Sequence, residues 1–271
     1  MKKLNGLEIA DYMKENQAHT VKVLRSNKIR PKLVIIRDNA SPVIAKYVAL
    51  KQQYGADIGV EVEDWLRDDI RAAIQEANAD NSVHGIIVQL PLNDMSEIDA
   101  IVAEITPEKD VDGLASNNRA KEKVVFESAT ATAVNWLLAG YDVDLAQSRI
   151  AVVGRGRLVG RPLIRMWQNS GYDVTAFGHD SDLAELKNYR VIVSATGVPH
   201  LIKSEMVAPG TTVVDAGTAS EGGVLVGDVD KSVRLRKDLA AITPKVGGVG
   251  PLTVTALFEH VQRAALSQIH D

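Results

Sequence analysis

Apolar residues recur along the first part of the chain in two alternating patterns, one helical and one extended. Residues 7–27 carry apolar side chains mostly at helical spacing, which predicts an amphipathic helix. The short run KLVIIRD follows and is typical of a buried strand. Beyond it, helical segments at 42–55 and 67–80 alternate with the strand-like GVEVEDW and HGIIVQLPL. This alternation predicts a parallel sheet with crossover helices.

The second part of the chain repeats the alternation after a less regular stretch. We expect a helix at 96–104, a loop at TPEKDVDGL, a polar connection at 115–128 and a helix through VNWLLAG. Four strand-like runs follow: RIAVVG, YDVTAFG, YRVIVSATG and TTVVDAG. The chain closes with an amphipathic helix from Leu252. Two series of strands and helices indicate two α/β lobes with a cleft between them.

Composition narrows the class of protein. The 271 residues suffice for two medium domains, and the net charge of −4 gives no general reason to bind nucleic acid or an anionic membrane. The absence of cysteine excludes disulfides and thiolate chemistry. The N-terminus lacks the apolar core of a signal peptide, and no run approaches the roughly 20 apolar residues of a membrane span. The histidines show no ligand spacing. We therefore expect a cytoplasmic enzyme with no metal site.

A glycine-rich turn stands between a strand and a helix in RIAVVGRGRLVGRPLIRMW. Gly154, Gly156 and Gly160 permit a tight turn, and the helix N-terminus offers free N–H groups to a pyrophosphate. Arg155 and Arg157 add positive charge. The alternative is an ordinary turn that uses glycine for packing, but the further strands favour dinucleotide binding. We therefore expect a Rossmann-like, doubly wound parallel-sheet domain here, beside an N-terminal α/β substrate domain.

The next predicted strand ends at FGHD, which brings His179 and Asp180 to the place where an adenosine ribose is usually recognised. On its own, His179 is more often a surface or packing histidine.

Three polar residues of the first lobe are candidates for chemistry. Tyr47 and Lys51 are four residues apart on a predicted helix and can face one side. A lysine in a partly apolar cleft has its pKa lowered towards neutrality and can exchange protons, although a solvated lysine is the commoner case. Gln89 closes an apolar strand at the carboxyl edge of the sheet, where such folds place ligands. It could equally satisfy loop backbone alone.

Two loops hold further candidates. Asp110 and Asp112 lie in PEKDVDGL, where either one could serve only to form a turn, and Gly113 is expected to make that turn. In KVGGVGPLT, three glycines precede Pro251 and expose backbone at the start of the last helix. Such a loop can lie against a flat ring or bind an anion. A plain helix-entry turn would not need three glycines.

Taken together, these segments resemble the bifunctional methylenetetrahydrofolate dehydrogenase/methenyltetrahydrofolate cyclohydrolase family. The resemblance runs nearly end to end through YVALK, GIIVQLPL, PEKDVDGL, VVGRGRLVGRP, VVDAG, VGDV and GGVGPLT, in the family's order. Each motif is weak singly, but the ordered set is specific. It implies a folate-binding catalytic domain at 1–128, completed by a C-terminal helix at 252–271, and an NAD(P)-binding domain at 129–251.

The resemblance also implies roles for individual residues. Lys51 matches the family's catalytic lysine, Gln89 the glutamine that tunes it, and Asp112 the aspartate that holds the pterin ring and completes the catalytic set. Substrate binding is implied, besides Asp112, for Tyr47, Gly248, Val249, Gly250 and Pro251. Cofactor binding is implied for Gly154, Arg155, Gly156, Arg157, Val159, Gly160, His179, Asp180, Thr196, Gly197 and Gly217. The family is commonly a homodimer joined through its nucleotide-binding domains.

The family's usual cofactor is NADP, but this chain has Asp180 where a serine or basic residue often stands. A carboxylate there repels a 2′-phosphate and accepts from a free 2′-hydroxyl, which favours NAD. The chain also departs from the family at Ile44, at the SATA segment 128–131, at Gly156 and at Val246.

The activity implied is oxidation of 5,10-methylenetetrahydrofolate to the methenyl form, followed by hydrolysis to 10-formyltetrahydrofolate. The first step mainly requires positioning of two rings. The second requires a proton carrier, for which Lys51 is the strong candidate. Three alternatives stay open at this point: a dehydrogenase without the hydrolytic step, a shikimate-dehydrogenase-like oxidoreductase, and a folate- or nucleotide-sensing protein without catalysis.

Overall fold

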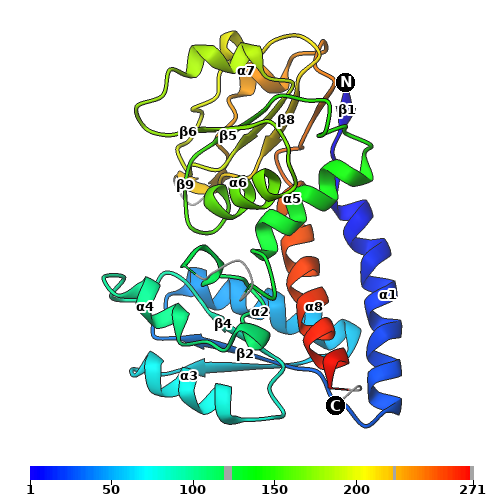
Figure 1. Cartoon of the computed structure of the whole chain (residues 1–271), viewed down its shortest axis with the longest axis vertical. Helices are drawn as coiled ribbons and strands as arrows, with labels where there is room; N and C mark the ends of the chain where they lie inside the picture. The colour runs from blue at the N-terminus through cyan, green and yellow to red at the C-terminus, as the bar shows by residue number, and fades with distance from the viewer. Residues whose placement is uncertain (119–123, 222–223, 269–271) are drawn as a thin grey trace. The chain divides into compact units, whose positions relative to one another are not determined.

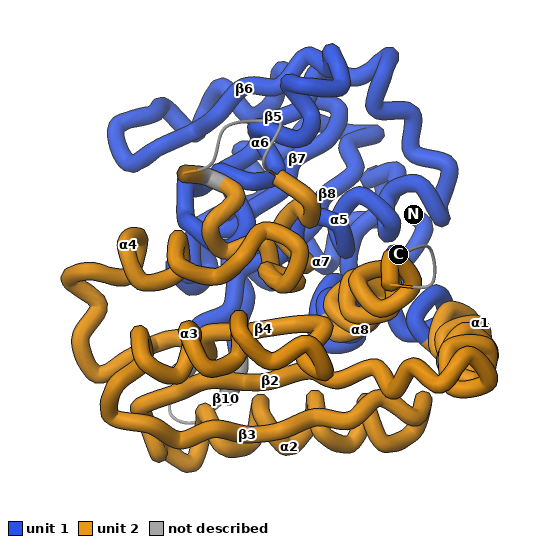
Figure 2. The backbone as a smooth tube through the Cα atoms, turned by 60° about the horizontal axis from the view of Figure 1, so that its bottom comes forward, with its two compact units in different colours: residues 1–10, 130–253 blue, residues 11–129, 254–271 orange. Residues whose placement is uncertain are grey.

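The computed structural model describes residues 1–118, 124–221 and 224–268. Its chain divides into two compact units, coloured separately in Figure 2. Unit 1 holds Met1–Ala10 and Thr130–Thr253, and unit 2 holds Asp11–Ala129 and Val254–Asp271. Each unit is built on its own parallel sheet, so the predicted α/β class and the two series of strands are confirmed.

The sheet of unit 1 is six-stranded, in the order β1-β11-β8-β7-β5-β6, and every neighbouring pair is parallel. The strands are β1 (Lys2–Lys3), β5 (Ile150–Val153), β6 (Val174–Phe177), β7 (Val191–Ser194), β8 (Thr212–Asp215) and β11 (Ala241–Ile242). Strands β6 and β7 lie on opposite sides of β5, so the chain reverses its direction across the sheet there. In such folds ligands bind at the carboxyl ends of the strands at this reversal.

Short helices and turns complete unit 1 around an aliphatic core. The helices are α5 (Ala129–Gly140), which begins at the unit boundary, α6 (Gly160–Asn169) and α7 (Lys231–Arg234). The 3-10 turns are η4 (Leu183–Asn188) and η5 (Ser204–Met206), and β9 (Ala219–Glu221) pairs with β10 (Val224–Val226) in an antiparallel ribbon. One core cluster joins Ala151, Ile192 and Val213 from three parallel strands to Phe177 and Tyr189, whose rings meet edge to face. This packing fixes the strand ends that carry the predicted nucleotide site.

Unit 2 has a three-stranded parallel sheet in the order β3-β2-β4, seen in the lower half of Figure 1. Its strands are β2 (Lys32–Arg37), β3 (Glu61–Leu66) and β4 (Gly85–Val88). Its helices are α2 (Pro42–Ile58), α3 (Ile70–Ala79) and α4 (Ile98–Ala103), with 3-10 turns η1 (Pro107–Lys109) and η2 (Ser116–Asn118). Alternate residues of β2 and β4 pack under α3 and α4 in one cluster.

Two long helices carry the chain from one unit to the other. They are α1 (Gly6–Ser26) and α8 (Val249–Ser267), and both were predicted from the apolar pattern. Within unit 2, α8 packs against the sheet: a Cβ built on Gly85 of β4 would come 3.0 Å from the side chain of Val261.

Most predicted elements are present with shifted ends. The helix expected at 42–55 runs on to Ile58, where Gly59 adopts φ +88° and closes it. The strand expected from His84 and stopped by Pro91 ends at Val88, so Gln89 lies just beyond it. Strands β1 and β11 are two residues long and were not predicted, because so short a run leaves no readable period.

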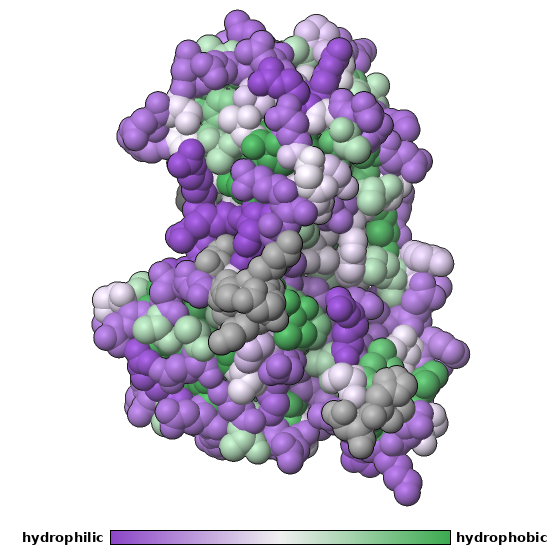
Figure 3. Space-filling model, viewed as in Figure 1, coloured by the Kyte–Doolittle hydropathy of each residue, from purple (hydrophilic) through white to green (hydrophobic). Residues whose placement is uncertain are grey.

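The surface on the face seen in Figure 3 is mainly hydrophilic, with hydrophobic residues scattered among polar ones. Among the residues that the structure describes, no helix is long and apolar enough to span a bilayer.

Candidate active site

Lys51 and Gln89 meet directly in unit 2. Helix α2 begins at Pro42. The preceding residue, Ser41, caps it, since its hydroxyl accepts a hydrogen bond from the Ile44 amide at 3.4 Å. The side chains of Ile44 and Val48 anchor this helix in the core. One turn after Tyr47, the Lys51 ammonium donates to Oε1 of Gln89 at 2.8 Å.

The orientation of the Gln89 amide is fixed by its own backbone neighbours. Its main-chain N–H donates to Ile36 at 2.8 Å, which continues the parallel ladder one residue past β4. Its side-chain NH₂ donates to the Leu90 carbonyl at 3.1 Å. With the NH₂ so occupied, the amide oxygen is the atom that faces Lys51.

Lys51 and Asp112 shift each other's protonation. Burial lowers the pKa of Lys51 below its usual value, and the nearby Asp112 carboxylate opposes that shift. Burial raises the pKa of Asp112 to about 7, against the opposing effect of the Lys51 cation. An amine and a carboxyl therefore interact electrostatically here, both with pKa values moved towards neutrality.

The loop that presents Asp112 separates the roles of its two aspartates. Asp110 is buried, and its carboxylate accepts from the amides of Leu114 and Ala115, each at 3.1 Å. Gly113 adopts φ +64°, as expected for the turn. Asp110 thus has the turn-forming role that the sequence left open for both aspartates, and Asp112 is the one beside Lys51.

Sequence reasoning missed His260. This histidine of α8 is buried, and its Nδ1 lies 2.8 Å from the Val111 carbonyl, next to Asp112 in the chain. The ring also stacks on Phe126 at 4.9 Å between centroids. Its place on the inner, apolar face of α8 was the only available signal, and that position alone does not reveal a partner 149 residues away.

The glycine turn of unit 1 is as tight as its spacing predicts. Gly154 follows β5 with φ +102°, and a Cβ there would come 2.5 Å from the Ala195 carbonyl oxygen. A Cβ on Gly160 would overlap the Gly154 carbonyl, so these two glycines allow strand, turn and helix to approach closely. Gly156 is exposed, and the nearest described atom to a Cβ there is 3.9 Å away. Arg157 and Val159 complete the turn, and Val159 stands directly before α6.

Arg155 lies over the end of β6. Its guanidinium donates to the Ala176 carbonyl at 3.0 Å, and a Cβ on Gly178 would lie 3.5 Å from its Nε. The exposed His179 and Asp180 follow, with 3.1 Å between the ring Nδ1 and the carboxylate. One cation and one carboxylate therefore stand at the same strand end.

The remaining unit 1 candidates lie on neighbouring strand ends. Thr196 and Gly197 follow β7, and Gly217 follows β8. A Cβ on Gly197, which has φ +69°, would be 3.6 Å from the Thr218 carbonyl oxygen, so the two loops are in contact. These residues and the glycine turn share the carboxyl edge of one sheet.

The loop before α8 packs on the start of the chain within unit 1. The Gly6 amide donates to the Gly247 carbonyl at 2.8 Å, and a Cβ on Gly6 would overlap the carbonyl of Gly248. Val249 begins α8, and Pro251 lies in its first turn. A Cβ on Gly250 would meet no atom of the described chain within 4 Å.

These features define a class of protein first. A glycine turn at the strand reversal of a parallel sheet is the mark of a nucleotide-binding α/β protein. The lysine–glutamine–aspartate cluster of unit 2 is suited to proton exchange. Each of these two groups lies within its own unit.

The comparisons with known proteins give the family. Residues 4–112 match the tetrahydrofolate dehydrogenase/cyclohydrolase catalytic domain, and residues 128–269 match the NAD(P)-binding domain of the same enzymes. The chain belongs to the tetrahydrofolate dehydrogenase/cyclohydrolase family. The predicted resemblance is confirmed, and the shikimate-dehydrogenase-like alternative is set aside.

Individual relatives cover almost the whole chain. The bifunctional protein FolD of Lactobacillus helveticus is 34% identical over 278 residues, covering 98% of each chain. The crystal structure of the bifunctional FolD enzyme from Campylobacter jejuni covers 99% of each chain at 31% identity, with a TM-score of 0.91. The Trypanosoma brucei enzyme, solved with NADP and an inhibitor, covers 98% of each chain at 28% identity, with a TM-score of 0.87.

Proposed function

We propose that this enzyme oxidises 5,10-methylenetetrahydrofolate to 5,10-methenyltetrahydrofolate and then hydrolyses that product to 10-formyltetrahydrofolate. The observation that carries the proposal is the 2.8 Å bond between the Lys51 amine and Gln89, beside Asp112, in a chain of this family. Unit 2 holds Tyr47, Lys51, Gln89 and Asp112, and unit 1 holds the nucleotide-binding turn and the loop at residues 248–251.

The nucleotide site fits the pyrophosphate of a dinucleotide. Gly154 and Gly160 allow the turn to be tight. The space beside Gly156 is open in the described structure, and a pyrophosphate could approach the backbone there. Helix α6 begins at this turn, where the positive end of its dipole favours an anion, and Arg155 and Arg157 add positive charge. When bound, an oxidised nicotinamide dinucleotide supplies the hydride acceptor for the first step.

The residues assigned to folate hold and orient the substrate. The Asp112 carboxyl, with its pKa near 7, can both donate to and accept from the pterin edge. Tyr47 is 40% exposed on α2 and offers a ring face to a flat substrate. Gly248, Val249, Gly250 and Pro251 supply the backbone that lies against the substrate, where the absence of side chains at two positions permits close approach.

Lys51 carries the proton of the second step. Water adds to the methenyl carbon, one of its protons is passed to N5 as the C–N5 bond breaks, and the other is released to solvent. The lowered pKa of Lys51 increases its neutral fraction, so the amine can accept a proton from the attacking water. Its bond to Gln89 Oε1 uses an N–H and leaves the nitrogen lone pair available.

The finer choice of dinucleotide follows from the end of β6. Arg155 attracts a 2′-phosphate, whereas Asp180 repels it and can accept from a free ribose hydroxyl. We therefore infer that the enzyme uses NAD as well as NADP. We also propose that it acts in the cytoplasm as a homodimer joined through unit 1, where β6 is an edge strand with an unpaired side.

One assay tests the proposal. Methylenetetrahydrofolate is incubated with NAD and with NADP in parallel, and reduced nicotinamide and methenyltetrahydrofolate are followed by absorbance. We expect reduction of at least one cofactor and faster loss of the methenyl product than in buffer. Reduction with no accelerated loss would identify a dehydrogenase without the hydrolytic step. Tight binding of both ligands without turnover would identify a sensor and overturn the proposal.

A further inference from the structure

Two buried aspartates of unit 1 pack closely against two glycines near the predicted nucleotide site. They come from the motifs VVDAG and VGDV, as Asp215 at the end of β8 and Asp228 after β10. A Cβ on Gly217 would overlap the Asp228 carboxylate, and a Cβ on Gly227 would overlap the Asp215 carboxylate. Each aspartate therefore rests on the glycine of the other motif, at a spacing that only hydrogen permits.

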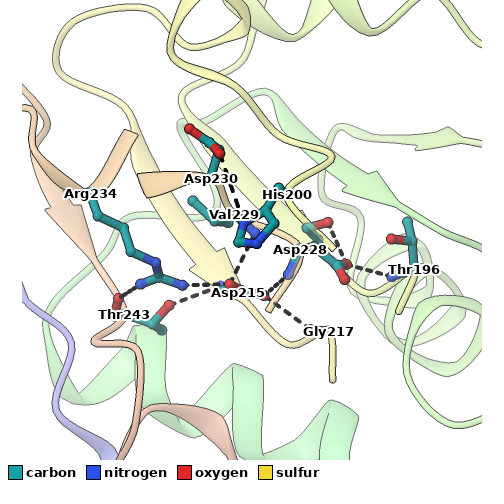
Figure 4. A network of polar contacts seen from close by, with 10 residues as sticks. Thr196, His200, Asp215, Gly217, Asp228, Val229, Asp230, Arg234 and Thr243 are labelled. Carbon is teal, nitrogen blue, oxygen red and sulfur yellow. Dashed lines mark hydrogen bonds and ion pairs between the residues drawn. The ribbon is translucent and has the colours of Figure 1, made fainter. Parts of the chain in front are cut away.

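Asp215 holds the VGDV segment in place. Its carboxylate accepts from the amides of Asp228 at 3.0 Å and Val229 at 3.1 Å. The guanidinium of Arg234 pairs with it at 2.5 Å, and Figure 4 shows Asp215 between Arg234 and Asp228. A buried carboxylate with these partners is anchored from both sides.

Asp228 in turn holds the loop after β7. It is completely buried, and its Oδ2 accepts from the Ser194 hydroxyl and from the Thr196 amide, both at 2.7 Å. Its Oδ1 has no hydrogen-bond partner among the described residues. The two bonds at Oδ2 are therefore the polar contacts by which this side chain fixes the loop.

That loop supports the glycine turn. The Ala195 carbonyl packs closely against Gly154, where a Cβ would come 2.5 Å from its oxygen. The Ala195 amide donates to the Val153 carbonyl of β5 at 2.8 Å. A shift of Thr196 moves the carbonyl on which the turn rests, because the two residues are adjacent in the chain. A continuous path thus runs from Asp228 through residues 194–196 to Gly154.

We propose that Asp228 is a positioning residue for dinucleotide binding, acting through Ser194 and Thr196 on the turn at Gly154. The proposal rests on the proposed nucleotide binding by unit 1, and it adds a residue that touches neither ligand. Asp228 sets the geometry of the strand ends at which the cofactor is held, and Asp215 with Arg234 keeps Asp228 in register.

The test separates cofactor binding from folding and from hydrolysis. Asp228→Ala removes the acceptor for two buried donors, so we expect the KM for the dinucleotide to rise roughly tenfold or more. Hydrolysis of methenyltetrahydrofolate uses no dinucleotide and is expected to stay within about twofold of the wild type. Asp228→Asn keeps one oxygen for both donors and is expected to recover most of the affinity. The fluorescence of bound reduced nicotinamide gives the same ranking independently of turnover.

Two further variants keep the proposal falsifiable. Ser194→Ala removes one of the two donors with little change of volume, so it tests the same role if Asp228→Ala folds poorly. We expect it to raise the KM for the dinucleotide, but less than Asp228→Ala does. Asp173→Asn, which removes an exposed charge paired with Arg149 in the same unit, is the matched control and should leave the KM unchanged. Equal losses of oxidation and hydrolysis, or an unchanged KM in Asp228→Ala and Ser194→Ala, would overturn the positioning role. A wild-type enzyme that reduces neither cofactor would instead refute the proposed function.

Discussion

The imidazole of His260 and the carbonyl of Val111 are joined by a 2.8 Å contact, which ties α8 to the residue directly before Asp112. A carbonyl can only accept, so Nδ1 carries the proton. Burial lowers the pKa of His260 to about 4, although its bond to Val111 opposes the shift, so the ring is neutral near pH 7. A neutral, stacked imidazole thereby fixes the backbone that presents Asp112.

His260→Leu is expected to weaken folate binding as well as stability. The substitution leaves the Val111 carbonyl without its buried donor, which costs about 1–3 kcal/mol of unfolding free energy. The loop that carries Asp112 loses its support, so the KM for methylenetetrahydrofolate should rise severalfold. Thermal unfolding and steady-state kinetics measure the two effects separately.

His84→Leu is the matched control for that experiment. His84 is also buried, but it accepts from the Lys32 amide at 3.2 Å and contacts Gln268 at 3.0 Å, and neither partner belongs to the Asp112 loop. It should lower the unfolding temperature without changing the KM. If His260→Leu behaved in the same way, His260 would have a structural role only.

The lowered pKa of His260 should also make the free energy of unfolding depend on pH. The folded-state pKa of about 4 lies below the usual 6.5, so the unfolded chain binds more protons between these values. Stability contributed at neutral pH is therefore lost as the pH falls from 6.5 towards 4. The destabilisation by His260→Leu should be smaller at pH 5 than at pH 7.5 in denaturant titrations; an equal loss at both values would contradict the neutral ring.

Lys51→Met is expected to abolish hydrolysis of methenyltetrahydrofolate. Removing a general acid–base group typically lowers a rate by about 10²–10⁴-fold. The loss is measured as the decay of the methenyl absorbance above the buffer rate. Lys46→Met, an exposed lysine on the same helix, is the control. A Lys51→Met enzyme with normal hydrolysis would refute the assigned role.

Asp112→Asn is expected to move the pH dependence of hydrolysis. The Asp112 carboxylate raises the pKa of Lys51 against the effect of burial, so its removal lowers that pKa further. If neutral Lys51 is the base, the rise of kcat with pH should occur at lower pH in the variant. Saturating substrate separates this shift from weaker binding. A shift to higher pH would exclude Lys51 as the base.

Asp180→Ser is expected to improve the use of NADP relative to NAD. The exposed carboxylate stands at the same strand end as Arg155, and its removal leaves the cation unopposed for a 2′-phosphate. The ratio of the two kcat/KM values measures the change. Glu185→Ser removes an equal charge from the nearby η4 turn and should not alter the ratio. An unchanged ratio in Asp180→Ser would reject Asp180 as a specificity residue.

The sequence predicted the elements and the polar residues at their ends, because both depend on local pattern. The α/β order, the tight turn at Gly154 and the position of Gln89 at a strand end follow from periodicity and glycine spacing. The residue pattern alone did not separate the role of Asp110 from that of Asp112, because both are carboxylates in one loop, and only the resemblance to the family selected Asp112. The folded chain shows that Asp110 accepts backbone amides and that Asp112 interacts electrostatically with Lys51.

Long-range partners were beyond the reach of pattern. His260 finds Val111, and Asp228 finds Ser194, through the packing of elements distant in the chain. The interlock of Asp215 and Asp228 likewise depends on the space left by two glycines, which spacing alone does not specify.

The position of β1 in the sheet of unit 1 limits where the chain can be truncated or fused to a purification handle. Lys2 and Lys3 form the outermost strand beside β11, although the rest of that sheet begins only at Ile150. A fragment that starts after residue 129 therefore exposes β11 as a bare edge open to pairing with other chains. A purification handle fused before Met1 would project from that same border.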